Sequence, residues 1–126
     1  MDDIPQGLPA SSRAQKIQKR AASVGFDWPN CDLVFEKLQE ELGELSVALD
    51  TGEKSQIEEE VGDLMFTVVN IARHVGVDAE SALRRCNHKF TARFKDMETE
   101  SEAQGEALAE LSLEQLNALW TKAKKP

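Results

Sequence analysis

Two short acidic motifs have the residue types and spacing to bind a metal ion. Residues 40–44 read EELGE and residues 60–63 read EVGD. Each motif contains two carboxylates three residues apart, a spacing that places both on one side of an α-helix. Four carboxylates that converge on one point cannot all ionise without a compensating positive charge. A hard divalent cation supplies that charge, and Mg²⁺ or Mn²⁺ suits a site made only of carboxylates.

Glu41 occupies an unusual position for a charged residue. At about 100° per residue, it falls between Leu45 and Ala48, inside the apolar stripe of a helix. A carboxylate there is costly unless a cation pairs with it. On the next helix, two further carboxylates flank the apolar stripe. The predicted metal ligands are therefore Glu41, Glu44, Glu60 and Asp63.

Other charged residues are candidates for supporting roles. Glu40 points away from the apolar stripe, where it can assist a ligand or act as a general base. Lys89 and Arg93 lie one turn apart along the edge of a later apolar stripe. A metal with flanking cations is the arrangement that neutralises charge on transferring phosphates. The alternative is that their charged ends are solvated and only their aliphatic stems lie over the apolar core.

The charge distribution excludes one class of partner. The chain has 15 basic and 23 acidic residues, a net charge of −8. Residues 36–63 hold ten acidic and two basic residues, which alone equals that net charge, whereas residues 73–95 hold six basic and two acidic residues. A nonspecific nucleic-acid binder needs a surplus of positive charge. We therefore expect no binding to a nucleic-acid polymer.

The elements that position these residues are predicted to be helices. With 126 residues and 40% hydrophobic composition, the chain is long enough for one domain. Capping residues and glycines predict five helices, at about 12–24, 31–50, 55–75, 79–97 and 113–125. Ser12, Asn30, Ser55, Asp78 and Ser112 are the expected N-caps. No alternating strand pattern is present, so the fold class is all-α, an antiparallel helical bundle.

The rest of the chain adds expectations about domains and location. Residues 1–9 are predicted to be a flexible tail, and residues 10–126 a single domain. No apolar run is long enough to span a membrane, and no signal peptide is recognisable. Cys31 and Cys86 match no zinc or redox spacing, so we expect buried free thiols and a cytoplasmic location.

The two acidic motifs, separated by 15 residues, resemble the signature of the all-α nucleoside triphosphate pyrophosphohydrolases. This superfamily includes MazG, the dimeric dUTPases and the phosphoribosyl-ATP pyrophosphohydrolases. The chain is most similar to the C-terminal catalytic domain of MazG, in residues 13–22, 24–29, 59–66, 69–77, 82–90 and 119–120. MazG proteins often carry two tandem copies of this domain, and the chain corresponds to one copy.

The resemblance implies roles for individual residues. Glu41, Glu44, Glu60 and Asp63 match the Mg²⁺ ligands of the family, and Glu40 completes the motif. Lys37, Lys89 and Arg93 match residues that contact or support the phosphates, and Trp120 matches an aromatic residue near the nucleotide. The family fold implies a homodimer whose long helices build a four-helix core.

The expected activity is Mg²⁺-dependent hydrolysis of a nucleoside triphosphate to the monophosphate and pyrophosphate, with broad base specificity. One alternative is a narrower enzyme that acts on dUTP or a modified nucleotide. Another is a helical dimerisation or regulatory module in which the acidic site holds a structural metal. The sequence alone leaves the base preference open.

Overall fold

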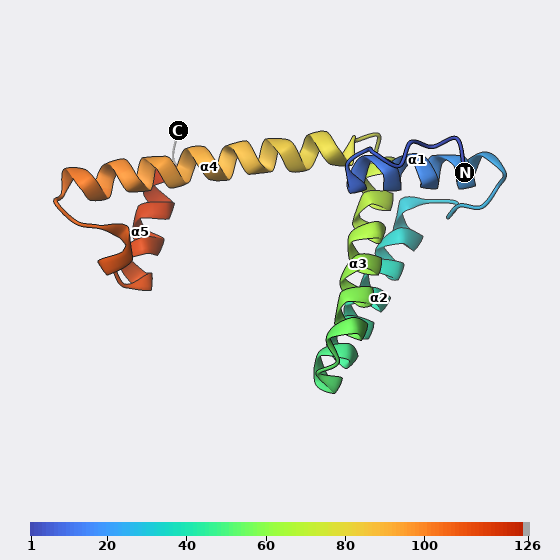
Figure 1. The fold of residues 1–126 in the computed structure, drawn as a ribbon, viewed down its shortest axis with the longest axis horizontal. Coiled ribbons are helices and arrows are strands. Elements are labelled where there is room, and N and C mark those ends of the chain that lie inside the picture. The colour runs from blue at the N-terminus through green and yellow to red at the C-terminus, as the bar shows by residue number, and fades with distance from the viewer. Residues whose placement is uncertain (125–126) are drawn as a thin grey trace. The chain divides into compact units, whose positions relative to one another are not determined.

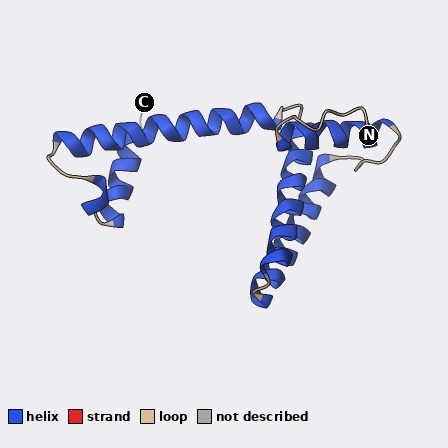
Figure 2. Cartoon of the chain, viewed as in Figure 1, coloured by secondary structure: helices blue, strands red, loops and turns tan. Residues whose placement is uncertain are grey.

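The computed structural model describes residues 1–124, and all regular elements among them are helical (Figures 1 and 2). The prediction of an all-α fold with five α-helices is confirmed. The helices are α1 (Ala10–Ser23), α2 (Cys31–Thr51), α3 (Lys54–His74), α4 (Ala79–Ala103) and α5 (Leu113–Lys124), with a 3₁₀ turn at Leu108–Glu110. The chain forms two compact units, residues 1–82 and 83–126, and each is described by itself.

Three of the predicted helix caps are confirmed. The Asn30 side chain accepts a hydrogen bond from the Leu33 amide at 3.1 Å, and the Asp78 carboxylate accepts one from the Ser81 amide at 2.9 Å. At α5, Ser112 and Gln115 each bond the other's backbone amide, which makes a reciprocal capping box.

Two predicted caps are wrong because the chain enters each helix earlier than the serine. The Pro9 carbonyl accepts a hydrogen bond from the Arg13 amide at 2.9 Å, so α1 begins at Ala10 and Ser12 lies within it. The Thr51 hydroxyl accepts a hydrogen bond from the Glu53 amide at 3.2 Å, which closes a tight turn. As a result, α3 begins at Lys54 and includes Ser55.

The α4 helix is longer than predicted. It continues to Ala103, whereas the predicted helix ended at about residue 97. The last turn is acidic, which is unfavourable at a helix C-terminus. Lys122 of α5 offsets this by pairing with Glu100 at 2.7 Å, a contact between distant positions that local sequence does not encode.

The α2 and α3 helices form an antiparallel hairpin that carries both acidic motifs (Figure 1). The connection is short because Gly52 adopts a left-handed conformation (φ +71°), which ends α2 and turns the chain. Val34 and Ala48 of α2 and Val69 of α3 are buried. The hairpin thus fixes the spacing between the two motifs.

The hairpin leaves much of the predicted core uncovered. At about 100° per residue, the apolar stripes of α2 and α3 include Leu42, Leu49, Met65, Val68 and Val75, and burial is the expectation for such stripes, but all five are exposed in the protomer. On α4, the apolar stripe consists of Leu83, Cys86, Phe90, Phe94 and Met97; the first four are likewise exposed, whereas Met97 is buried. The helical periodicity identified apolar stripes correctly, but it cannot tell which helix covers them.

The α1 helix packs on α3 through a buried amide. The Gln18 side chain donates a hydrogen bond to the Phe66 carbonyl at 2.8 Å, and the Gln15 side chain accepts one from the Ala79 amide at 2.8 Å. Residues 1–9 were predicted to be a flexible tail, which stays a prediction. In the structure, Ile4 is buried and both carboxylate oxygens of Asp3 accept hydrogen bonds from Arg20.

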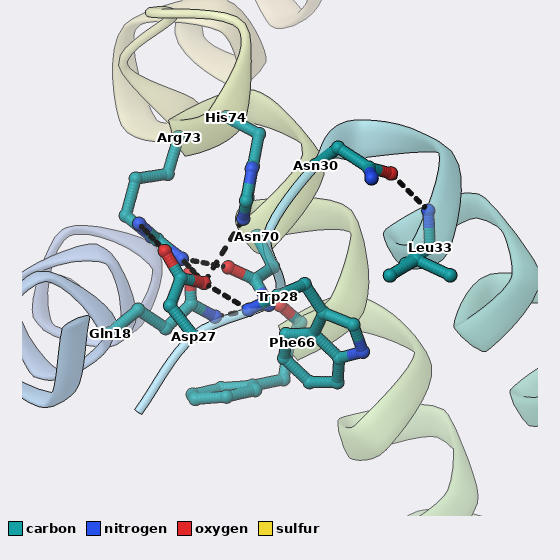
Figure 3. A network of polar contacts seen from close by, with 9 residues as sticks. All are labelled: Gln18, Asp27, Trp28, Asn30, Leu33, Phe66, Asn70, Arg73 and His74. Carbon is teal, nitrogen blue, oxygen red and sulfur yellow. Dashed lines mark hydrogen bonds and ion pairs between the residues drawn. The ribbon is translucent and has the colours of Figure 1, made fainter. Parts of the chain in front are cut away.

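A polar network fastens the connection between α1 and α2 to the end of α3 (Figure 3). Arg73 donates to both oxygens of Asp27, at 3.0 and 2.6 Å, and also to the Asn70 side chain at 2.6 Å. His74 Nε2 lies 3.1 Å from Asp27 Oδ1, and the Trp28 amide donates to the same oxygen. The hydrogen bonds from Arg73 are the main cause of a lowered pKa of Asp27, about 2.

This network predicts a specific dependence of stability on pH. The pKa of Asp27 is lower in the folded than in the unfolded chain, so its contribution is complete above about pH 4 and is lost as the pH falls towards 2. We expect Asp27→Asn to lower the free energy of unfolding by about 2 kcal/mol at pH 7. Urea denaturation between pH 2 and pH 7 measures the difference, which should shrink below pH 4.

Asp96→Asn is the matched control, because Asp96 is an exposed residue within α4. It should change the free energy of unfolding little at any pH. A difference for Asp27→Asn that stayed constant from pH 7 to pH 2 would contradict the assigned role of this carboxylate.

Among the described residues, no helix combines the length and the apolar character that crossing a bilayer requires.

Candidate functional site

The α2–α3 hairpin brings the two acidic motifs together. Glu41 of α2 and Glu60 and Asp63 of α3 each offer an oxygen atom, and these atoms lie within 4.8 Å of one another. Glu60 and Asp63 are one turn apart on α3, so both reach Glu41 across the interface between the helices. We call these three residues the acidic cluster.

Glu41 is buried in the hairpin, as its place in the apolar stripe predicted. Its exposed fraction is 4%, and its Oε2 atom is buried without a hydrogen-bond partner. Glu60 also has a buried Oε2 atom without a partner. Buried polar atoms are rarely left unpaired, so these two oxygens are the atoms best placed to bind a cation.

The crowding of carboxylates affects the ionisation of Glu60. Partial loss of hydration is the largest cause that raises its pKa above the usual range, followed by the negative charges of Glu44 and Asp63. Glu44 acts on Glu60 through its charge and lines the same hollow, so it borders the acidic cluster. A cation at the cluster would remove this repulsion and lower the pKa of Glu60 again.

Lys37 supplies one positive charge to the cluster. Its Nζ atom lies 2.9 Å from Glu41 Oε1 and 3.4 Å from Glu40 Oε1. The hydrogen bond to Glu41 is the main cause that raises the pKa of Lys37. In this arrangement Lys37 holds Glu41 in place, and a direct contact with substrate phosphates stays a prediction.

A hollow of about 650 Å³ lies along the hairpin beside the acidic cluster. Glu40, Glu44 and Glu60 line the end nearest the cluster. The other lining residues are Gly43, Val47, Ala48, Gln56 and Glu59. This volume is within the range of small-molecule sites.

Part of this hollow was not predicted from the sequence. Gln56 and Glu59 were not singled out, although both are near Glu60. Gln56 is four residues before Glu60, the helical spacing that places two side chains on the same face. That spacing was the available signal. Val47 offered none, because an isolated valine on a helix surface is common.

The remaining predicted site residues belong to the unit formed by residues 83–126. Within this unit, the Arg93 guanidinium lies over the Trp120 ring, with Cζ 5.5 Å from the ring centroid. Phe90 packs against Trp120 with ring centroids 5.3 Å apart. The structure therefore brings Arg93 and Trp120 together, while Lys89 is exposed on α4.

The donor set of the acidic cluster fits a hard divalent cation. Among the described residues, this group is made only of carboxylates, with no thiolate or imidazole that would favour zinc. The unpartnered oxygens of Glu41 and Glu60 are the atoms left to coordinate such an ion.

The fold and the acidic cluster together define a class of protein. A comparison with known protein families identifies that class. Residues 31–97 match the MazG nucleotide pyrophosphohydrolase domain family, and the chain belongs to this family. The matched segment contains the whole α2–α3 hairpin and most of α4. It includes both acidic motifs.

Curated relatives match nearly the whole chain. The chain is 43% identical over 127 residues to "Nucleoside triphosphate pyrophosphohydrolase" of Escherichia coli strain K12, covering 99% of the chain and 48% of that protein. It is 50% identical over 117 residues to "Nucleoside triphosphate pyrophosphohydrolase/pyrophosphatase MazG" of Thermotoga maritima, covering 93% of the chain and 45% of the relative. The chain thus spans about half the length of these two relatives.

Proposed function

We propose that the chain hydrolyses nucleoside triphosphates to the monophosphate and pyrophosphate, with Mg²⁺ held by Glu41, Glu44, Glu60 and Asp63. The observation that carries this proposal is the acidic cluster, with its unpartnered buried oxygens, in a chain of this family. The names of the Escherichia coli and Thermotoga maritima relatives support the same reaction.

The bound Mg²⁺ would neutralise phosphate charge and favour deprotonation of the attacking water. Glu41 fixes the centre of the site because it is buried and bonded to Lys37. Glu40 is exposed at the rim of the hollow, where its carboxylate can accept the proton of the attacking water. Lys89 and Arg93 would stabilise the charge of the departing pyrophosphate.

The proposed activity is tested by measuring pyrophosphate release from canonical and modified nucleoside triphosphates, with Mg²⁺ and with EDTA. We expect release from several bases with Mg²⁺ and a loss of at least about 100-fold with EDTA, because metal-free carboxylates repel the triphosphate. Release from one nucleotide alone would contradict broad base specificity and indicate a pocket that selects one base. No release from any nucleotide would refute the proposed activity.

We also propose that two copies of the chain form a homodimer, which we place in the cytoplasm. The exposed apolar residues of the hairpin support the dimer. Phe35, Leu42 and Leu49 are spaced by seven residues on α2, and Val61, Met65 and Val68 form a matching stripe on α3. We call these six residues the hairpin apolar face.

The hairpin apolar face and the hollow are on different sides of the hairpin. At about 100° per residue, both apolar stripes fall on one side of the antiparallel pair, and Gly43, Val47 and Glu59 fall on the other. A stripe this long is typical of a buried interface. A second copy would cover it with an identical stripe and complete a four-helix core while leaving the hollow open.

A further inference from the structure

Gly43 has no structural reason within its own helix to be glycine. It lies in the middle of α2, where glycine is a poor helix former compared with alanine. Its φ is not positive, unlike that of Gly25, Gly52, Gly76 and Gly105. A Cβ atom built at Gly43 would meet no heavy atom within 4 Å, so close packing does not require glycine either.

The position of Gly43 in the hollow supplies a reason. Gly43 lines the hollow between Glu40, one turn before it, and Val47, one turn after it. A Cβ atom at this position would occupy space in the hollow itself. Glycine therefore leaves the α2 backbone open to close approach by whatever binds there.

The two ends of the hollow differ in chemistry. Glu40, Glu44 and Glu60 line the end beside the acidic cluster, where a cation and the phosphates would lie. Towards the hairpin turn, the lining adds the apolar side chains of Val47 and Ala48, the amide of Gln56 and the carboxylate of Glu59. Apolar side chains with an amide and a carboxylate suit the hydroxyl and amino groups of a sugar or a base, and they offer no positive charge to a phosphate.

We propose that Gly43 is a specificity-determining residue that admits the nucleoside end of the substrate into the hollow, while the phosphates remain at the acidic cluster. This inference rests on the proposed function, because it assigns one part of the nucleotide to each end of the same site. It predicts that a methyl group at position 43 hinders the nucleoside but not the polyphosphate.

The test compares nucleotides with a ligand that has no nucleoside. Isothermal titration with Ca²⁺ in place of Mg²⁺ measures the affinity of the full chain for ATP, GTP, CTP, UTP and inorganic tripolyphosphate. Gly43→Ala should weaken binding of the nucleotides about tenfold, the usual effect of one misplaced methyl group in a pocket. Binding of tripolyphosphate should change less than about twofold, because the acidic cluster is intact.

Gly62→Ala is the matched control. Gly62 is also within a helix, and a Cβ atom there meets nothing within 4 Å, but Gly62 does not line the hollow. Gly62→Ala should leave the affinities for all five ligands unchanged. Circular dichroism should show that both variants keep full helix content, because alanine favours helix.

Equal weakening of nucleotide and tripolyphosphate binding by Gly43→Ala would overturn the inference, as would unchanged nucleotide binding. Failure of the wild-type chain to bind any nucleotide would overturn it too. The binding assay is independent of turnover. A chain that binds nucleotides with the predicted discrimination but releases no pyrophosphate would refute the proposed function and leave the assignment of Gly43 intact.

Discussion

Glu41→Gln is expected to lower kcat/KM for nucleoside triphosphate hydrolysis at least about 1,000-fold, since loss of several kcal/mol of charge stabilisation has that effect. Glu41 is buried and provides an unpartnered oxygen to the acidic cluster. Glutamine has nearly the same shape but carries no negative charge, so the substitution removes a charged ligand and little packing. Asp63→Asn should have a similar effect from the facing helix.

The control for this prediction is Glu36→Gln, which changes an exposed glutamate of the same helix outside the cluster. It should retain full activity, and all three variants should keep the helix content of the wild-type chain. A Glu41→Gln variant that retained more than a tenth of wild-type activity would remove this residue from the metal site. Steady-state kinetics with Mg²⁺ provide the measurement.

Met65→Glu is expected to convert the proposed dimer into a monomer. Met65 is 60% exposed in the protomer and lies in the middle of the hairpin apolar face. A second copy would place the new carboxylate in an apolar interface, beside its own symmetry mate, without a partner. Sedimentation equilibrium should give about 28 kDa for the wild-type chain, twice 14.0 kDa, and about 14 kDa for the variant.

Ser55→Glu adds the same charge at an exposed position of α3 away from the hairpin apolar face. It should sediment like the wild-type chain. A wild-type chain that remained monomeric at micromolar concentration would contradict the dimer, and so would a Met65→Glu variant that sedimented with the wild-type mass.

Much of the fold could be predicted because its signals are local. The Asn30 and Asp78 caps, the Ser112–Gln115 capping box and the left-handed Gly52 each depend on residues within one turn of the chain. The proximity of Glu41, Glu60 and Asp63 was predictable for a similar reason. Helical periodicity placed each on its helix, and a short turn forces the two helices to pack side by side.

Other features depend on contacts between distant residues, which one sequence does not specify. In the extension of α4, Glu100 pairs with Lys122 of α5, and in the connection between α1 and α2, Asp27 pairs with Arg73 of α3. Likewise, helical periodicity places Leu42 and Leu49 on an apolar stripe and predicts that they are buried, although they are exposed in the protomer. Periodicity identifies an apolar stripe but not the surface that covers it, which can belong to a second chain.

The most direct test of the central claim is the identity of the products. Wild-type chain incubated with Mg²⁺ and a nucleoside triphosphate should yield monophosphate and pyrophosphate in equal amounts, as resolved by ³¹P NMR. Neither should form in the presence of EDTA or with Glu41→Gln prepared in the same way. Nucleoside diphosphate and inorganic phosphate as the products, or equal turnover with EDTA, would contradict a metal-dependent pyrophosphohydrolase centred on the acidic cluster.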